Sequence, residues 1–250
     1  MLKTVVCDDE PPALELMASL LVDTHKVEIV AACQSVREAL AVINQGGVDL
    51  VVFDIEMPDL SGVDAFGQVA VEPRPLVVFA TAHSEYAVEA FGVDAIDYIL
   101  KPFNSARVKK AVDKAARLSR LVRERQEGAP IEASQTPPAD LSGVLKIKDA
   151  GKSFFIPYRD IIWIEAAGDY SILHMAGREI TVRVAIKALE AELPDKLFVR
   201  VHRSSIIALA SIREVDHLPK GEAQVLLSDG STVRTSRSYR DVIQKLGVAG

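Results

Sequence analysis

The first 120 residues alternate between short apolar runs and segments whose apolar residues recur every three or four positions. One such segment runs from Leu14 to Leu21, with Met17 and Ala18 on the same face. The apolar runs occur at residues 2–7, 27–32, 49–54, 76–81 and 96–100. Runs that are apolar throughout are typical of parallel strands that helices cover on both faces. The pattern predicts a doubly wound α/β domain with a parallel sheet of five strands.

After residue 142 the pattern changes to many short strands separated by turns. Strands are expected at residues 144–148, 152–156, 161–165, 170–175, 179–182, 212–217, 223–227 and 231–235. Turn residues such as Asp229-Gly230 stand between them, and only residues 184–193 and 238–246 have helical spacing. This half of the chain is therefore predicted to be a mostly antiparallel β domain.

A proline-rich segment separates the two patterns. Residues 128–143 contain three prolines and have no periodic apolar face. Such a segment cannot bury enough apolar surface to offset the entropy that ordering would cost, so a flexible linker is expected. Before it, Asn104 is expected to cap a last helix of the first domain. The predicted division is a domain at residues 1–120, a linker at 121–141 and a second domain at 142–250.

Charge is distributed unevenly between the two halves. Residues 1–120 carry 11 Lys and Arg against 18 Asp and Glu, whereas residues 142–250 carry 16 against 13. A basic half beside an acidic one suggests nucleic acid as its partner. No apolar run reaches the roughly 18 residues that a membrane span needs, and no signal-peptide pattern is present, so a cytoplasmic, soluble protein is expected. Cys7 and Cys33 give neither a disulfide framework nor a metal-binding spacing.

Acidic residues stand where two of the predicted parallel strands end. Asp8 and Asp9 follow the first run, and Asp54 closes the third. The carboxyl ends of parallel strands meet at one edge of the sheet, where doubly wound folds build their sites. Three carboxylates at one place repel one another, so positive charge must lie among them. Lys101, at another predicted strand end, and Mg²⁺, which prefers oxygen ligands, both meet that need.

Phosphoryl transfer is the chemistry that this arrangement suits. Asp54 is the candidate nucleophile, because a carboxylate can form an aspartyl phosphate. Asp9, Asp54 and the backbone carbonyl of Glu56 would hold the metal, and Asp8 would act through a metal-bound water. Lys101 and the hydroxyl of Thr81 would bind the phosphoryl oxygens. Taken singly, each has a plainer interpretation: Asp8 and Asp9 as a helix cap, Thr81 as a local hydrogen-bonding group, and Lys101 as a solvated charge.

Four short motifs of the first half resemble the receiver domain of a response regulator, over about residues 1–120. They are Asp8-Asp9-Glu10, Asp54-Ile55-Glu56-Met57-Pro58, Thr81-Ala82 and Tyr98-Ile99-Leu100-Lys101-Pro102-Phe103. The resemblance implies a flavodoxin-like fold, phosphorylation of Asp54 by a sensor histidine kinase, and a cis peptide bond before Pro102. It also implies that Thr81 and Tyr98 act as a switch. A homodimer would form through helix 84–91, strand 96–100 and helix 104–125.

The second half is similar to the LytTR-type DNA-binding domain over roughly residues 142–247. Three segments carry this resemblance: Ile162 to Tyr170, Phe198 to Ile206 and Thr235 to Tyr239. The family inserts loops into successive major grooves of promoter DNA that carries direct repeats. Where the family often has asparagine this chain has Ala208, so a polar role at that position is absent.

The LytTR resemblance places a definite set of residues on the DNA. They are Asp169, Tyr170, Arg200, His202, Arg203, Ser204 and Arg237, with Arg203 and Arg237 the expected base contacts. A strand through residues 198–206 would put Arg200, His202 and Ser204 on one face, and Arg203 would lie opposite them or in a following turn. Plainer interpretations stay open: Arg200 pairs with Glu165 or Asp195, and His202 is a packed or surface imidazole.

These features together predict a phosphorylation-regulated transcription factor of a two-component system, and not an enzyme acting on a separate substrate. One alternative is a Mg²⁺-dependent phosphatase with Asp54 as nucleophile and Glu56 as general acid. Another is a phosphorylation-regulated scaffold whose β half binds protein.

Overall fold

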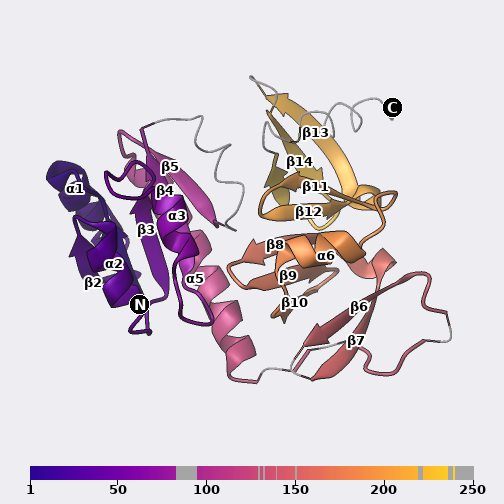
Figure 1. Cartoon of the computed structure of the whole chain (residues 1–250). Coiled ribbons are helices and arrows are strands. Elements are labelled where there is room, and N and C mark those ends of the chain that lie inside the picture. Colours follow the sequence, from indigo (N-terminus) through magenta and orange to yellow (C-terminus); the bar gives the residue numbers. More distant parts are fainter. Residues whose placement is uncertain are drawn as a thin grey trace. The chain divides into compact units, whose positions relative to one another are not determined.

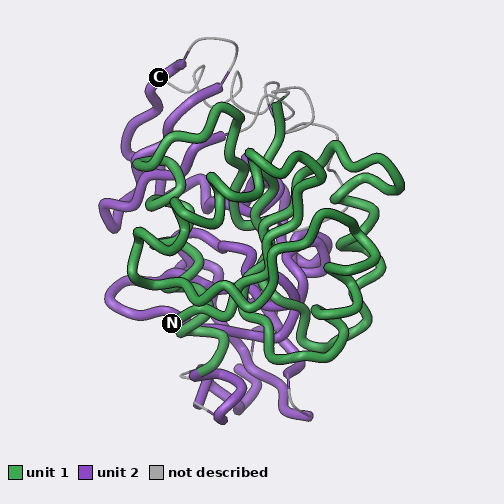
Figure 2. Tube along the Cα trace, turned by 90° about the vertical axis from the view of Figure 1, so that its left-hand side faces the viewer, with its two compact units in different colours: residues 1–123 green, residues 124–250 purple. Residues whose placement is uncertain are grey.

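The computed structural model describes residues 1–82, 95–128, 130–131, 133–138, 140–149, 151–218, 222–235 and 239. The chain divides into two compact units, residues 1–123 and residues 124–250, shown in different colours in Figure 2. No helix of the described ranges is long and apolar enough to cross a membrane.

Unit 1 is built on a sheet of five parallel strands in the order β2-β1-β3-β4-β5 (Figure 1). The strands are β1 (Leu2–Cys7), β2 (Val27–Cys33), β3 (Leu50–Asp54), β4 (Leu76–Thr81) and β5 (Asp97–Leu100). The three central strands are almost wholly buried, as expected when both faces of a sheet are covered. The predicted doubly wound α/β domain is therefore confirmed.

Four described helices accompany this sheet: α1 (Pro11–Val22), α2 (Val36–Ile43), α3 (Gly62–Gly67) and α5 (Ser105–Gln126). Alternate strand residues, such as Val51 and Phe53, pack against α2 and α3 in one core cluster. The Asn104 side chain accepts a hydrogen bond from the Arg107 amide at 3.2 Å and so caps the start of α5. The helix expected at residues 84–91 lies outside the described residues.

The described part of unit 2 contains three antiparallel sheets, which confirms the predicted β domain. Their orders are β10-β9-β8-β12-β11, β13-β14-β15 and β6-β7. The strands are β6 (Val144–Asp149), β7 (Lys152–Pro157), β8 (Ile161–Ala167), β9 (Tyr170–Met175), β10 (Arg178–Val182), β11 (Phe198–His202), β12 (Ser205–Ala208), β13 (Ile212–Leu218), β14 (Glu222–Leu227) and β15 (Thr232–Arg234). Helix α6 (Ile186–Glu192) follows β10, and two short 3-10 turns, Tyr158–Asp160 and Leu209–Ser211, precede β8 and β13.

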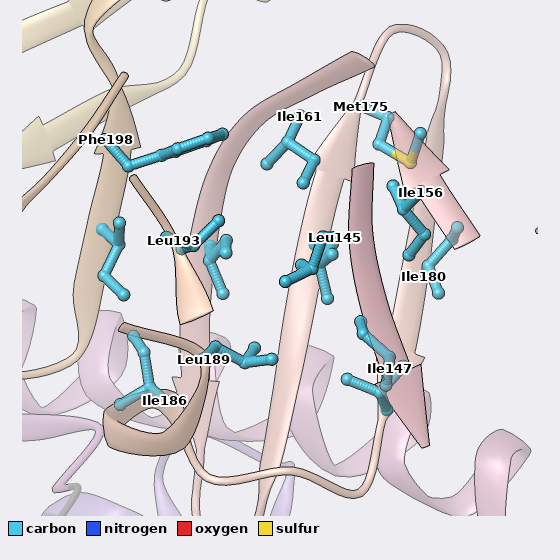
Figure 3. Close-up of a cluster of buried hydrophobic side chains, with 14 of the residues drawn as sticks. Leu145, Ile147, Ile156, Ile161, Met175, Ile180, Ile186, Leu189, Leu193 and Phe198 are labelled. Carbon is cyan, nitrogen blue, oxygen red and sulfur yellow. The ribbon is translucent and has the colours of Figure 1, made fainter. Parts of the chain in front are cut away.

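The five-stranded sheet of unit 2 has a core on each face. On one face, Ile164 and Leu173 pack with residues of the β6–β7 hairpin and of α6, such as Leu145 and Leu189 (Figure 3). On the other face, Trp163 of β8 joins a smaller cluster with residues of β14 and β15. Every residue of β8 and β9 is buried because both faces of this sheet are covered.

Part of the proline-rich segment packs on unit 2. Ile131 is buried in the core that contains the β6–β7 hairpin, and the Ser134 carbonyl accepts a hydrogen bond from the Phe155 amide at 2.9 Å. The helix α5 continues to Gln126, where the neighbouring Arg125 binds Asp149. The composition of the segment did not predict this anchoring, because one isoleucine between prolines has no periodic signature.

Of the two positions expected for Arg203, opposite Arg200 on a continuing strand or in a following turn, the structure has the turn. The chain reverses at Arg203 and Ser204, so that β12 pairs antiparallel with β11 on one side and with β8 on the other. A continuous strand would leave β8 without this neighbour. The second helix expected in this half, at residues 238–246, lies outside the described residues.

Candidate functional site

Four charged side chains meet beyond the carboxyl ends of β1, β3 and β5, and we call them the acidic pocket: Asp8, Glu10, Asp54 and Lys101. One carboxylate oxygen from each of the three acids lies within 4.8 Å of the others. Asp8 and Asp54 are buried, whereas Glu10 is exposed. The parallel sheet produces this convergence, because Cys7 and Phe53, which precede the two aspartates, are register partners on adjacent strands.

Lys101 lies at the centre of the acidic pocket. Its Nζ is 2.7 Å from Asp54 Oδ2 and 2.9 Å from both Asp8 Oδ2 and Glu10 Oε2, and its side chain is only 15% exposed. Burial alone would lower the pKa of Lys101, but hydrogen bonds to Asp54, Glu10 and Asp8 outweigh it and raise that pKa well above its ordinary value. Lys101 therefore stays charged and offsets part of the repulsion among the carboxylates.

The acids of the pocket differ in their electrostatics. Burial raises the pKa of Asp8, although the hydrogen bonds from Lys101 and from the Glu10 amide oppose that rise. The Glu10 amide donates to Asp8 Oδ1 at 3.0 Å. The hydrogen bond from Lys101 lowers the pKa of the exposed Glu10 carboxyl. Asp8 therefore resists ionisation more than Glu10 does.

Asp54 is held in one orientation by two donors. Its Oδ1 accepts from the Glu56 amide at 3.1 Å, and its Oδ2 accepts from Lys101. Helix α3 begins directly beside it, since a Cβ built on Gly62 would lie 2.0 Å from the Asp54 backbone oxygen. Only glycine allows this close approach, and the Gly62 amide donates to the Ile55 carbonyl at 3.0 Å.

Thr81 and Tyr98 lie on the strands next to Asp54. Thr81 is buried at the end of β4, and its carbonyl accepts from the Lys101 amide at 2.8 Å. The Tyr98 ring is buried and lies 5.5 Å from that of Phe79, so it already has an inward position. The peptide bond between Lys101 and Pro102 is cis.

The other two expected metal ligands are Asp9 and the backbone carbonyl of Glu56. The Asp9 side chain is half-buried and does not belong to the group of converging carboxylates. That group includes Glu10, which entered the sequence prediction only as part of the Asp8-Asp9-Glu10 motif. Its position two residues after Asp8 was the available signal, because short Asp side chains commonly bind the amide two positions on.

Some of the residues expected to face DNA are half-buried and others are buried. Asp169 is half-buried in the turn between β8 and β9, and Tyr170 at the start of β9 is buried. His202 and Arg203 are half-buried where β11 turns into β12, and Ser204 is buried. Arg237 lies outside the described residues.

Arg200 is engaged within the protein. Its Nη1 lies 2.5 Å from Glu190 Oε2 of α6, its Nε donates to the His202 carbonyl at 3.3 Å, and its Nη2 donates to the Arg203 carbonyl. Arg200 thus forms an ion pair, as the plainer interpretation expected, and one partner is Glu190. His202 Nδ1 lies 2.8 Å from Ser204 Oγ and accepts from the Ser204 amide at 3.2 Å.

Comparisons with known proteins agree with this architecture. Residues 4–113 match the family model of the response regulator receiver domain, and residues 151–247 match that of the LytTr DNA-binding domain. The chain is 32% identical over 243 residues to the transcriptional regulatory protein BtsR of Escherichia coli K12, covering 96% of each chain. It is 31% identical over 258 residues to the sensory transduction protein LytT of Enterococcus faecalis, covering 98% of this chain and 99% of that one. The response regulatory domain of mrkE from Klebsiella pneumoniae is 31% identical, with a TM-score of 0.45, over 48% of this chain and 98% of that one.

The fold and the matched families define a two-domain signalling protein with a receiver and a DNA-binding output. The chain belongs to the response regulators that combine a receiver domain with a LytTR-type DNA-binding domain. It is a phosphorylation-regulated transcription regulator, and neither the phosphatase nor the scaffold alternative is favoured.

Proposed function

We propose that Asp54 accepts a phosphoryl group from a sensor histidine kinase and that this event controls dimerisation and DNA binding. The observation that carries the proposal is the position of Asp54. It is a buried carboxylate at a strand end, with Lys101 Nζ at 2.7 Å and Asp8 beside it. A nucleophile of this kind needs a fixed orientation and adjacent positive charge, and the pocket provides both.

The chemistry of the donor set fits a divalent cation. Three carboxylates converge around one ammonium, so the pocket keeps an excess of negative charge, and all its free donor atoms are oxygens, which Mg²⁺ prefers. The proposed ligands are Asp8, Asp9, Asp54 and the backbone carbonyl of Glu56. Of these, the Asp8 and Asp54 carboxylates belong to the converging group, which Glu10 completes. When bound, the ion would supply positive charge for the phosphoryl oxygens.

The protein's own groups then have separate roles in the transfer. An Asp54 carboxylate oxygen forms the new bond to phosphorus as the bond to the donor's histidine nitrogen breaks. Lys101, already within hydrogen-bonding distance of Asp54, and the hydroxyl of Thr81 bind the oxygens of the transferred group. Tyr98, inward against Phe79, fits a switch that couples the pocket to the β5 side of the receiver. The proposed dimer forms on that side, through residues 84–91, 96–100 and 104–125.

The proposed output is binding of double-stranded promoter DNA with direct repeats. Arg203, in the turn between β11 and β12, and Arg237 are the proposed base contacts, because arginine reads guanine with two hydrogen bonds in the major groove. Asp169 lies in the turn between β8 and β9, and His202 is the last residue of β11. Both are proposed to face the DNA. Dimerisation raises affinity for paired sites through effective concentration, without new base contacts.

Replacement of the nucleophile tests the proposal directly. Full-length Asp54→Asn should incorporate no phosphoryl group from radiolabelled acetyl phosphate with Mg²⁺, while Asp59→Asn, an exposed acid five residues later, should label like wild type. Footprinting with and without acetyl phosphate should show phosphorylation-dependent protection by wild type and Asp59→Asn but not by Asp54→Asn. Retained labelling of Asp54→Asn would exclude Asp54 as the acceptor.

A further inference from the structure

The turn between β11 and β12, formed by Arg203 and Ser204, is held by side chains that sequence reasoning assigned to DNA. The Arg200 side chain is only 12% exposed. Its guanidinium contacts the Glu190 carboxylate and the backbone carbonyls of His202 and Arg203. Each bond uses a different nitrogen, so the planar fork of the guanidinium spans from helix α6 to the turn.

The carbonyls of His202 and Arg203 belong to the part of the β11–β12 hairpin where strand pairing is irregular. The β11–β12 register shifts between Arg200 and His202, so the ladder does not continue regularly into the turn. Arg200 supplies donors to carbonyl groups at this irregularity, and buried carbonyls need such partners. From the other side, His202 Nδ1 binds both the amide and the hydroxyl of Ser204.

We propose that Arg200 is a positioning residue for DNA recognition, fixed by Glu190, and that it shapes the turn that presents Arg203. The inference rests on the proposed function, in which this turn faces DNA. It separates two arginines that lie three residues apart. Arg203 contacts the base, whereas Arg200 sets the backbone from which Arg203 extends.

Electrostatics support this division of roles. A DNA phosphate would compete with the Glu190 carboxylate for Arg200. If Arg200 moved to the phosphate, Glu190 would lose its cation and would face the negatively charged DNA. The contact that Arg200 already makes is therefore incompatible with strong phosphate binding. Its fork geometry, by contrast, suits a rigid support, which lysine cannot reproduce.

The test measures the affinity of the full-length protein, treated with acetyl phosphate, for two duplexes. One duplex is enriched by the wild-type protein from a random library, and the other has a random sequence of the same length. Glu190→Gln is the decisive variant. A positioning role predicts about tenfold weaker binding to the enriched duplex and unchanged binding to the random one. If Arg200 were a DNA contact restrained by Glu190, removing the acid would strengthen binding to both duplexes and overturn the proposal.

Two variants of Arg200 separate geometry from charge. Arg200→Lys keeps the charge and should lose about tenfold in specific affinity. Arg200→Gln should leave the salt dependence of binding to the random duplex unchanged. A fall of about 0.9 in the slope of log affinity against log salt would instead identify a phosphate contact and refute the proposal.

A matched variant controls for loss of stability. Glu179 of the same unit also pairs its carboxylate with a basic side chain, His174 Nδ1, at 3.0 Å, and its side chain is 34% exposed. Glu179→Gln should leave specific affinity unchanged, and a loss equal to that of Glu190→Gln would overturn the positioning role. A wild-type protein that enriches no duplex would overturn the proposed DNA-binding function itself. Wild-type enrichment with unaffected Arg200 and Glu190 variants would overturn this inference alone.

Discussion

The acidic pocket of unit 1 and the β11–β12 turn of unit 2 both surround a largely buried cationic side chain with oxygen atoms, but the oxygens differ in kind. Lys101 contacts three carboxylates. Arg200 contacts one carboxylate and two backbone carbonyls. A carboxylate changes its charge when it is esterified, protonated or bound to a cation, whereas a backbone carbonyl does not.

The difference between the two regions follows the difference between the two cations. Lysine is a compact charge on a flexible stem with three rotatable donors, so it can follow oxygens that move. Arginine presents its donors in a fixed plane, so it holds a shape. The pocket is therefore built to change state and the turn to keep one, as expected of an input site and an output surface.

The largest effect should come from Lys101→Met, which keeps most of the side-chain volume but removes the charge. It should lower the free energy of unfolding by about 3–5 kcal/mol at neutral pH, because Asp8 and Asp54 stay buried without their cation. Urea denaturation measures this change. The loss should shrink as the pH falls and Asp8, whose pKa is raised by burial, becomes protonated.

A surface lysine provides the control for this prediction. Lys26 Nζ lies 2.6 Å from Asp113, and both side chains are about half exposed, at 50% and 44%. Lys26→Met should cost less than about 1 kcal/mol. Similar losses for the two variants would show that the pocket does not depend on its central charge.

Gly62→Ala should have the next largest effect. The new Cβ would meet the Asp54 backbone oxygen at 2.0 Å, so helix α3 or the end of β3 must move, at a cost of about 3 kcal/mol. The labelling rate of Asp54 should fall with stability, because the displaced backbone carries the nucleophile. Gly67→Ala, where a Cβ would have no atom within 4 Å, should change neither thermal stability nor labelling appreciably.

The pocket was largely predictable from the sequence. Asp8 and Asp54 end runs that are too apolar for anything but buried strands, and parallel strands place such ends at one edge. Glu10 was not predictable in the same way. It is exposed, and its approach to Lys101 depends on a local turn fixed by one amide hydrogen bond to Asp8.

Local sequence left the β11–β12 turn open beside a continuous strand. Arg203 and Ser204 are not typical hairpin residues, and the alternation of apolar and polar residues in this segment also suits a strand, so the sequence did not decide between the two. Side chains from outside the turn, above all Arg200 with its partner Glu190, determine the reversal. Such tertiary contacts leave no periodic signal, which is also why the burial of Ile131 went unpredicted.

Arg203→Ala tests the proposed base contact in the β11–β12 turn. If Arg203 reads a base, its loss should weaken binding to the enriched duplex by about 1–3 kcal/mol and affect a random duplex much less. Arg159→Ala, with a side chain 86% exposed in the same unit, should have no comparable effect. An equal loss on both duplexes would make Arg203 a phosphate contact and remove the proposed contrast with Arg200.

The smallest effect is a pH dependence of stability that has opposite signs for Asp8 and Glu10, two of the three acids beside Lys101. Burial raises the pKa of Asp8 in the folded state, so folding favours its protonated form. Stability should therefore fall as the pH rises from the unfolded pKa of about 3.9 through the folded value, and stay lowered above it. Asp8→Asn should relieve this loss, so the variant should be more stable than wild type at neutral pH and lose that advantage below about pH 4.

Glu10→Gln should show the opposite sign. The hydrogen bond from Lys101 lowers the pKa of Glu10, so its carboxylate contributes stability that is present above its unfolded pKa and lost as the pH falls through the folded value. Because Glu10 is exposed, solvent screening keeps that contribution small. Chemical denaturation of both variants between pH 3 and 7, a range set around the unfolded pKa values of about 4, measures the two signs. Destabilisation of Asp8→Asn at neutral pH would mean that Lys101 more than compensates for burial, and the acidic pocket would then resemble the fixed turn more than a site built to change.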